Sequence, residues 1–512
     1  MKGINDRKIM VPTAFIILFM AFSLSVVSAD TYNASTLSFS DVKSAVKAAR
    51  DGDTVLVPSG NSTWNETLFI TKNIILEGAG IGETIITAGS GVGTSGLINF
   101  EPDSFSRTSG ELFRVTGFEF RGDDKRIIVL NNPTGTYVNT IRIDHNKFEG
   151  VQYGARFSGY IDGLIDNNIF IDVTLHEIYV LGRDDMSWEN LSTEPGESDL
   201  TFIEDNEFIN SGSLVGGGHG SGYVLRHNDI KLSMDYVTFL DAHGNLPSGG
   251  DPNPIANRGT RVTEVYENDW TGITRTVQLL DLRGGVGILF NNKLTGTGAT
   301  PYVRLREEDA PNAFNSAPST VVHGGQYYEC ENNHYSSIIS EPGIGSRWQD
   351  YWHICGDCPR YTASPSYNNG AMSTRNWEVN TLYVDSPAYD PVKGTYLWNN
   401  KFNGNEEIKG IINMTGDNYY IVEDRDYFNF NQNFTGTSGC GYGLLTSRPN
   451  SGLVAGVGYY STDNKVLYRA VNSSTWEEYY TPYTYPHPLR GEEILYGETS
   501  IGSPQGLRIM EE

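Results

Sequence analysis

The sequence predicts an all-β chain wound into a parallel β-helix, a solenoid in which each turn of the backbone stacks on the turn before. Two observations predict this fold. A motif of a polar residue, Asn, any residue and a large apolar residue recurs, each time after an alternating, strand-like run such as TIRID or EVYE. The composition also favours many short strands and turns, since Gly, Tyr, Phe, Asn and Thr are frequent while Lys is scarce.

The recurring Asn sets the expected length of one turn. The motif occurs with its Asn at Asn146, Asn168, Asn206, Asn228, Asn268, Asn292, Asn333 and Asn400. Successive Asn residues are 22, 38, 22, 40, 24, 41 and 67 residues apart. The shortest intervals match one turn of a parallel β-helix, and the longer ones match a turn that carries an inserted loop. Because equivalent positions stack about 4.8 Å apart, we expect the Asn side chains to form an internal ladder at a tight bend.

The N-terminal part of the sequence predicts a secretion signal and a cap. Residues 1–29 have the weakly basic start and apolar stretch of a signal peptide, with cleavage after Ala29; an uncleaved membrane anchor is the alternative. Seven Asn-x-Ser/Thr sequons fit a secreted or cell-surface glycoprotein. The stretch DVKSAVKAAR, residues 41–50, carries the clear helical pattern of the chain. We expect this helix to cover the open N-terminal end of the solenoid and block pairing at its edge.

The segment GDTVLVPSGN, a Gly-rich second strand and the Asn-punctuated turns resemble the right-handed parallel β-helix superfamily of pectin and pectate lyases. The resemblance covers residues 30–410 and implies a right-handed solenoid there. IRIDHNKF resembles a segment of the pectate lyases, which carries over Asp144 and His145, but their catalytic RxPxxR pattern is absent. Residues 411–512, rich in aromatic side chains, are expected to form a β segment that packs along or caps the C-terminal end.

Charge and cysteine content limit the partners and the compartment. The formal net charge is −25, and such a surface repels nucleic acid and anionic membranes. The cysteines are Cys330, Cys355, Cys358 and Cys440. In an oxidising compartment they predict one or two disulfides. Cys355 and Cys358 also have the spacing of a zinc or redox motif, although no second CxxC accompanies them.

Basic residues recur at a second fixed distance from the Asn. The positions 13 to 15 residues after six successive Asn residues hold Arg183, His219, His243, Arg283, Arg306 and Arg347. Inserted loops follow these positions, predicted at 184–199, 244–260, 307–324 and 348–390. Loops carried along one edge of a solenoid are where such proteins build binding sites.

Two positions before the basic residue, successive turns carry Asp241, Asp281 and Arg304. Stacking would place Asp241 about 5 Å from Asp281. Such a carboxylate pair shares a proton, binds a cation such as calcium, or is neutralised by neighbouring Arg side chains. The candidate catalytic residues are therefore Asp241, His243, Asp281 and Arg283, and the two Asp residues are also the candidate calcium ligands.

Three functions fit this pattern. In a polyuronate lyase the Arg side chains hold sugar carboxylates and His243 or an Arg acts as the base. In a glycoside hydrolase the two Asp residues form the catalytic pair. In a non-catalytic surface or matrix protein the basic column binds acidic glycans or forms structural ion pairs. The predicted partner is an acidic polysaccharide, and three copies associating side by side is one expected assembly. Candidate substrate-binding residues are Arg183, His219, Arg258, Arg261, Arg304, Arg306, Arg347, Trp348 and Trp352.

Overall fold

The computed structural model describes residues 29–133, 136–182, 194–232, 238–244, 259–306, 392–412 and 421–491, with short strands inside the segment 307–391. The predicted signal segment lies outside them except for its last residue. None of the helices described is long and apolar enough to cross a membrane.

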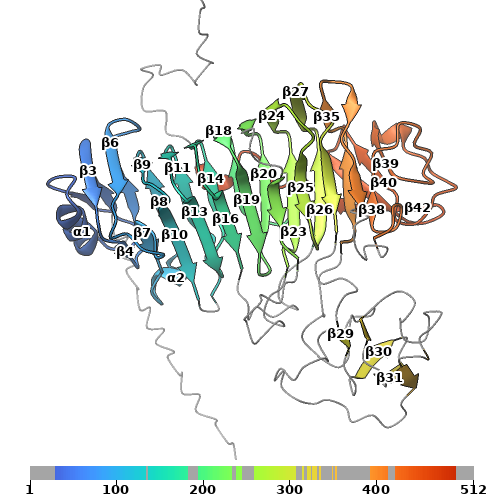
Figure 1. The fold of residues 1–512 in the computed structure, drawn as a ribbon, viewed down its shortest axis with the longest axis horizontal. Helices are drawn as coiled ribbons and strands as arrows, with labels where there is room; N and C mark the ends of the chain where they lie inside the picture. Colours follow the sequence, from blue (N-terminus) through green and yellow to red (C-terminus); the bar gives the residue numbers. More distant parts are fainter. Residues whose placement is uncertain are drawn as a thin grey trace, which may run out of the picture.

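The described chain winds through three long parallel sheets, here called A, B and C (Figure 1). One turn consists of β5 (Ile75–Glu77) in sheet A, β6 (Thr84–Ala88) in sheet B and β7 (Ile98–Phe100) in sheet C. Each later turn repeats this order, so every strand pairs with its equivalents in the neighbouring turns. Crossovers between parallel strands of one sheet are right-handed almost without exception. The predicted right-handed parallel β-helix is confirmed.

The remaining strands have the following bounds. Sheet A also contains β1 (Thr31–Asn33), β2 (Thr54–Leu56), β8 (Phe113–Thr116), β11 (Ile141–Asp144), β14 (Leu164–Asp166), β17 (Thr201–Glu204), β20 (Gly222–Arg226), β23 (Val262–Tyr266), β26 (Val286–Phe290), β34 (Thr395–Trp398) and β38 (Tyr427–Phe428). Sheet B contains β3 (Gly60–Trp64), β9 (Glu119–Arg121), β12 (Lys147–Glu149), β15 (Ile169–Ile171), β18 (Glu207–Ser211), β21 (Asp229–Leu232), β24 (Asp269–Ile273), β27 (Lys293–Gly296), β35 (Lys401–Phe402) and β36 (Glu406–Glu407). Sheet C contains β4 (Leu68–Ile70), β10 (Arg126–Asn132), β13 (Tyr153–Gly159), β16 (His176–Leu181), β19 (Ser213–Gly218), β22 (Thr238–Ala242), β25 (Gln278–Leu282), β28 (Tyr302–Leu305) and β37 (Gly410–Ile412).

The Asn ladder lies at the bend between sheets A and B. The backbone N–H of Asn168 donates to Oδ1 of Asn206 at 3.0 Å, and Nδ2 of Asn168 donates to the same oxygen at 3.0 Å. Asn206 repeats both bonds toward Asn228. The residue before each Asn of this ladder has a left-handed φ near 55°, as at His227, which makes the bend tight. The predicted ladder is confirmed.

Asn333 lies outside the described residues, and the described ladder passes directly from Asn292 to Asn400. Nδ2 of Asn292 donates directly to Oδ1 of Asn400, 108 residues further on, at 2.7 Å. The chain between β28 and β34 is therefore one insertion, where the sequence suggested two separate loops. Described parts of it form small antiparallel pairs among β29 (Phe314–Asn315), β30 (Thr320–His323), β31 (Gln326–Cys330), β32 (His334–Tyr335) and β33 (Trp352–Ile354).

The N-terminal helix α1 spans Phe39–Ala48, two residues earlier than predicted. The side chain of Ser38 caps it by accepting a bond from the N–H of Asp41. Val42 and Val46 join the solenoid core, and α1 lies at the N-terminal end of the β-helix (Figure 1). A second short helix, α2, spans Ser106–Ser109.

The C-terminal part of the chain adds a further sheet and covers sheet A. The sheet consists of β39 (Cys440–Gly443), β40 (Gly458–Ser461), β41 (Val466–Asn472) and β42 (Thr475–Tyr480). The segment that follows, residues 480–490, runs back along the outer face of sheet A, where Arg226 donates to Tyr483 O at 2.7 Å and to Thr484 O at 2.9 Å. The solenoid continues to β38, beyond the predicted limit at residue 410.

Asp144 and His145 lie on this sheet A side of the molecule. Asp144 is fully buried, accepts from Arg114 Nε at 2.7 Å and lies 2.8 Å from His145 Nδ1. Burial raises the pKa of Asp144, but bonds from Arg114 and His145 outweigh it and hold the pKa below its ordinary value. The pair suggested by the lyase-like segment therefore belongs to the structural ladder corner.

Candidate functional site

The outer face of sheet C carries the residues that the sequence singled out. Asp241 pairs in register with Asp281, and Asp281 pairs with Arg304, on the adjacent strands β22, β25 and β28. The predicted stacking of the two Asp residues is confirmed. The same column of outward positions continues upstream through Gly216 and Tyr179.

His243, Arg283 and Arg306 follow two positions later and form a second column beside the first. His219 does not belong to it. A Cβ built on Gly218 would lie 3.6 Å from the Cβ of His243, so Gly218 is the stacked neighbour and His219 falls one residue further, in a turn. Counting from the Asn failed here because the number of residues between the ladder and sheet C varies from turn to turn.

Other predicted binding residues separate from this face or lie outside the described residues. The Arg261 side chain is buried, with Nε donating to Gly220 O at 3.1 Å and Nη2 lying 3.2 Å from Asp199 Oδ2, so it anchors the backbone. This burial favours a structural role for Arg261, and its predicted substrate role stays a prediction. Arg183, Arg258, Arg347 and Trp348 lie outside the described residues, as does the side chain of Trp352.

Asp281 is the centre of an ion cluster. Its side chain is 0% exposed, whereas those of Arg283, Arg304 and Arg306 are 14%, 23% and 26% exposed. Arg304 Nε donates to Oδ1 at 2.8 Å, Arg306 Nη2 to Oδ2 at 3.0 Å and Arg283 Nε to Oδ2 at 3.0 Å. Burial raises the pKa of Asp281, yet the bonds from Arg304 and Arg306 outweigh it and lower the pKa below its ordinary value. Asp281 is therefore a carboxylate at neutral pH.

Arg283 bridges the two Asp residues and also contacts His243. Its Nη2 donates to Asp241 Oδ2 at 2.8 Å, and its Nη1 lies 3.1 Å from Nδ1 of His243. A guanidinium only donates, so Nδ1 accepts and carries no proton. The ring proton is then on Nε2, which lies 3.1 Å from Asp241 Oδ2. His243 is neutral in this arrangement.

This geometry limits what the predicted catalytic residues can do. A buried, ionised Asp281 held by three guanidinium groups has no proton to give and is closed to a sugar, so it does not suit the acid or the nucleophile of a hydrolase. Calcium binding by Asp241 and Asp281 would require Arg283 to move from between them. No group of three or more His, Cys, Asp or Glu side chains suited to a metal occurs in the described part of the chain.

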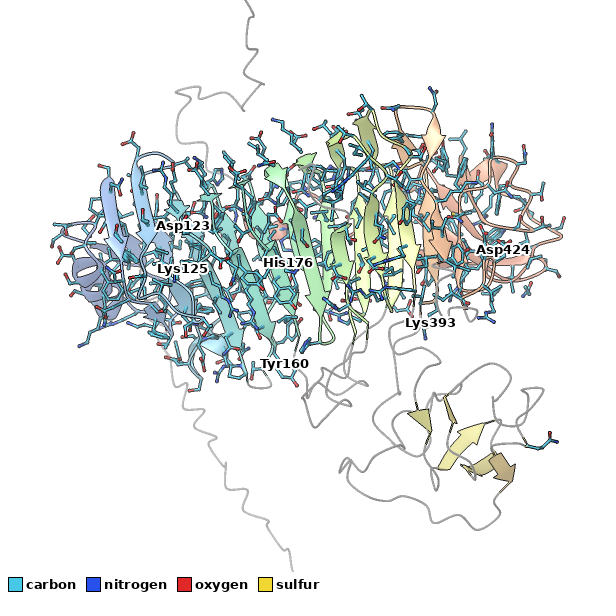
Figure 2. All side chains as sticks on the ribbon, in the orientation of Figure 1. Asp123, Lys125, Tyr160, His176, Lys393 and Asp424 are labelled. Atoms are coloured by element: carbon cyan, nitrogen blue, oxygen red, sulfur yellow. The ribbon has the colours of Figure 1, made fainter. Side chains whose placement is uncertain are left out.

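Sequence reasoning missed an aromatic row next to this cluster. The rings of Tyr153 and Tyr179 stack with centroids 5.6 Å apart, and those of His176 and Tyr179 stack at 5.0 Å. His176 lies over the middle of sheet C (Figure 2). Burial lowers the pKa of His176 to about 4, so the ring is neutral. These residues do not recur at a fixed distance from the ladder Asn residues, so the sequence pattern did not reveal them. Known strand boundaries would have identified them as outward-facing residues of β13 and β16.

Gly216 gives Tyr179 its position. A Cβ built on Gly216 would lie 2.7 Å from Tyr179 Cδ2 and 3.1 Å from His176 Cε1. Any larger residue would displace both rings. The run Gly216–Gly218 therefore lets the aromatic row lie flat against sheet C, directly beside Asp241.

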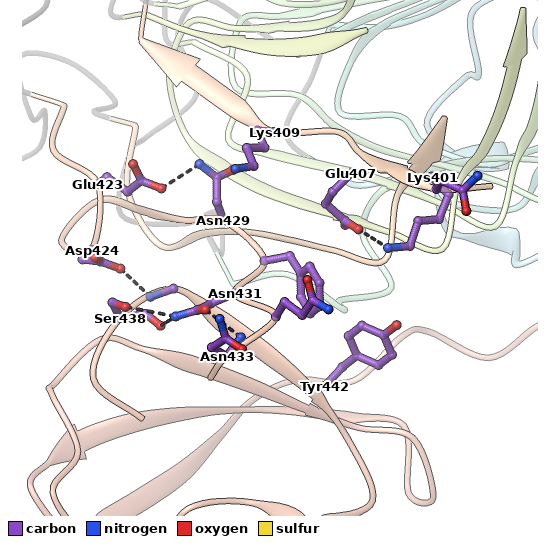
Figure 3. A pocket seen from close by; sticks show the side chains of 14 residues that line it. Lys401, Glu407, Lys409, Glu423, Asp424, Asn429, Asn431, Asn433, Ser438 and Tyr442 are labelled. Carbon is purple, nitrogen blue, oxygen red and sulfur yellow. Dashed lines mark hydrogen bonds and ion pairs between the residues drawn. The ribbon is translucent and has the colours of Figure 1, made fainter. Parts of the chain in front are cut away.

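A separate hollow of about 600 Å³ lies at the C-terminal end of the solenoid, between the last turns and the following segment (Figure 3). Several of its charged and amide side chains bond to one another or to the backbone. Glu423 accepts from Asn429 at 2.8 Å, and Lys401 pairs with Glu407. Near it, Cys440 is a buried free thiol whose pKa is raised by burial. Cys440 is thus outside any disulfide in the structure, and the side chains of the other three Cys lie outside the described residues, so a disulfide among them stays a prediction.

Comparisons with known proteins add distant likenesses. No family model and no curated protein matches the chain. Solved structures similar to it include an alginate lyase from Paenibacillus sp. str. FPU-7, with 14% identity, 55% of this chain and 99% of that chain covered, and a TM-score of 0.32. A family 28 exopolygalacturonase of Yersinia enterocolitica has 11% identity, coverage of 55% and 70%, and a TM-score of 0.27. ORF18 of Geobacillus virus E2 has 11% identity, coverage of 88% and 86%, and a TM-score of 0.28. Likenesses this distant do not decide function, which has to come from the residues on sheet C.

Proposed function

We propose that this chain is secreted and that the outer face of sheet C binds an acidic polysaccharide and cleaves it by β-elimination. The observation that carries the proposal is the cluster around Asp281. Arg283, Arg304 and Arg306 surround the buried Asp281 carboxylate, and Arg283 also contacts the Asp241 carboxylate. Three guanidinium groups against two carboxylates leave a net positive charge and part-exposed guanidinium groups, in a chain of net charge −25. Guanidinium groups of this kind bind sugar carboxylates with charge-assisted hydrogen bonds.

Elimination fits this cluster better than hydrolysis does. The base takes the proton beside the sugar carboxylate, a carbon–carbon double bond forms, and the bond from the neighbouring carbon to the glycosidic oxygen breaks. The released oxygen takes up a proton from water. It requires neutralisation of the carboxylate and a base, and no carboxylic acid. A sugar carboxylate that binds Arg283 competes for the guanidinium now held against His243. His243 Nδ1 is then available as the base, 3.1 Å from the position Arg283 leaves.

A second candidate function is binding without cleavage. Both ring nitrogens of His243 are engaged, by Arg283 and by Asp241, which favours a structural role for this side chain. The cluster would then hold an acidic glycan at the cell surface without reacting with it.

The test is incubation with a panel of polyuronates, with and without calcium, while following ultraviolet absorbance of unsaturated products and the number of new reducing ends. Elimination raises both. Reducing ends without absorbance refute elimination, and binding without either supports the second candidate. Calcium, still a prediction, would be required only if the Asp241–Asp281 pair holds it. Arg304→Gln should weaken binding about tenfold, the cost of a lost charge-assisted bond, because Asp281 keeps its two other partners. Lys293→Ala, which removes a positive charge that is 77% exposed on sheet B, is the matched control.

A further inference from the structure

Two Arg residues lie on adjacent strands of sheet C, upstream of the Asp281 cluster. Arg126 begins β10 and pairs in register with Tyr153, and Arg156 on β13 pairs with Tyr179 on β16. Arg156 lies in the same outward column that continues to Asp241.

Neither guanidinium has a carboxylate partner among the described residues. Arg126 donates to Gln152 Oε1 and to Thr94 O, both at 3.2 Å, and lies 5.3 Å from the centre of the Tyr153 ring. Arg156 makes no hydrogen bond or ion pair with a described residue, although it is partly buried. Burial lowers the pKa of Arg156, and the neighbouring charge of Arg126 lowers it further. Arg remains protonated at neutral pH regardless, so both charges persist.

This arrangement is costly unless an anion joins it. Two like charges on adjacent strands, both partly removed from water and near enough for one to act on the other, destabilise the folded chain. Arg126 and Arg156 differ in this respect from the three Arg residues further along the same face. Arg283, Arg304 and Arg306 each contact a carboxylate. The chain has 62 acidic residues against 37 basic ones, so a carboxylate partner could readily have been supplied from within. The flat rings of Tyr153 and Tyr179 beside the Arg pair suit the face of a sugar ring.

We propose that Arg126 and Arg156 form a second anion-binding subsite, which holds the carboxylate of an acidic sugar belonging to the same polysaccharide that occupies the Asp281 cluster. The inference rests on the proposed function. In sheet C, β13 and β28 are five strand spacings apart, about 24 Å. A ligand that reaches both subsites is therefore a polymer or a long oligomer that lies across the strands, with acidic groups on more than one unit.

The experiment is to measure the affinity of polyuronate oligomers of increasing length by calorimetry, using the full chain, Arg156→Gln and Arg304→Gln. For the unsubstituted chain we expect affinity to rise steeply once the oligomer spans both subsites. Arg156→Gln should remove that rise and weaken the binding of long oligomers at least tenfold. Lys293→Ala is the control for lost positive charge. Long-oligomer affinity in Arg156→Gln equal to that of the control would overturn the inference.

The two variants separate this inference from the proposed function. If Arg304→Gln binds normally while Arg156→Gln does not, the Asp281 cluster is not the site and the Arg126–Arg156 subsite stands. Thermal unfolding gives a second readout, because removing an unpaired charge should leave the melting temperature unchanged or raise it. A clear fall in melting temperature would show that Arg156 is structural and contradict the proposal. Polyphosphate bound as tightly as polyuronate of equal length would overturn the assignment to an acidic sugar.

Discussion

The Asn ladder makes a prediction whose size follows from its hydrogen bonds. Substituting Asn206→Ala removes the acceptor for the backbone N–H of Asn168, at 3.0 Å, and the donor to the carbonyl oxygens of Ile165 and Glu204, at 2.9 and 3.1 Å. These groups are buried at the corner of sheets A and B, where water does not replace the lost bonds. An unpaired buried backbone group costs about 1–3 kcal/mol, and a carbonyl that keeps another partner costs less. We expect a loss of about 3–5 kcal/mol in the free energy of unfolding.

The assay is urea unfolding of both proteins, made in a bacterial host without N-glycosylation and followed by circular dichroism. The control is Asn61→Ala, at an exposed position on β3. It should change the free energy by less than about 0.5 kcal/mol, as most surface substitutions do. If Asn206→Ala costs no more than about 1 kcal/mol, the ladder bonds are not what holds the bends.

Three further predictions concern other parts of the molecule. Glu264, fully buried on sheet A between Tyr480 Oη and the N–H of Gly196, has its pKa raised by burial to about 7 from 4.5. Protonated Glu264 therefore stabilises the folded chain fully below about pH 4.5, and this stabilisation is lost as the pH rises through 7. In Glu264→Gln, which has no ionising group there, the free energy of unfolding should fall by about 3 kcal/mol less over this pH range than in the unsubstituted chain. Gly216→Val should displace the Tyr179 ring and weaken polyuronate binding while the secondary structure stays intact. The control is Gly93→Val, because a Cβ at Gly93 meets nothing within 4 Å. Equal binding by the two variants would contradict the role of the aromatic row. The thiol of Cys440 should resist alkylation until the chain is unfolded, and rapid reaction in the native state would show that it is not buried.

How far the sequence predicts the structure depends on whether a residue repeats for a structural reason. Asn146 to Asn292 repeat because each closes the same bend, so their spacing predicts the number of turns and the order of the strands. Asn333 matches the same motif but lies outside the described residues. The described ladder runs directly from Asn292 to Asn400, a contact between residues 108 positions apart, which no local pattern reveals.

The functional face shows the same limit. Asp241 and Asp281 could be predicted to stack because they lie at equal distances from ladder residues, and the structure places them on adjacent strands. The chemistry of the two Asp residues could not be predicted in this way. It depends on Arg283, which bonds to both carboxylates, and on Arg304, which bonds to Asp281 from the next turn. Arg126 and Arg156 were missed because the decisive observation is the lack of a carboxylate near them among the described residues, which is a property of three-dimensional packing.

The two halves of the sheet C face therefore differ in a way that bears on how a chain would bind. Around Asp281 the Arg side chains are already oriented by carboxylates, so a sugar acid arriving there must compete with Asp241 and Asp281 for the guanidinium groups. At Arg126 and Arg156 no such competition exists among the described residues, and an anion gains the full interaction. We expect the upstream subsite to supply most of the affinity, while the Asp281 cluster supplies the geometry that a reaction needs. The binding energy gained at Arg126 and Arg156, remote from the reacting bond, then offsets the cost of displacing Arg283 from His243.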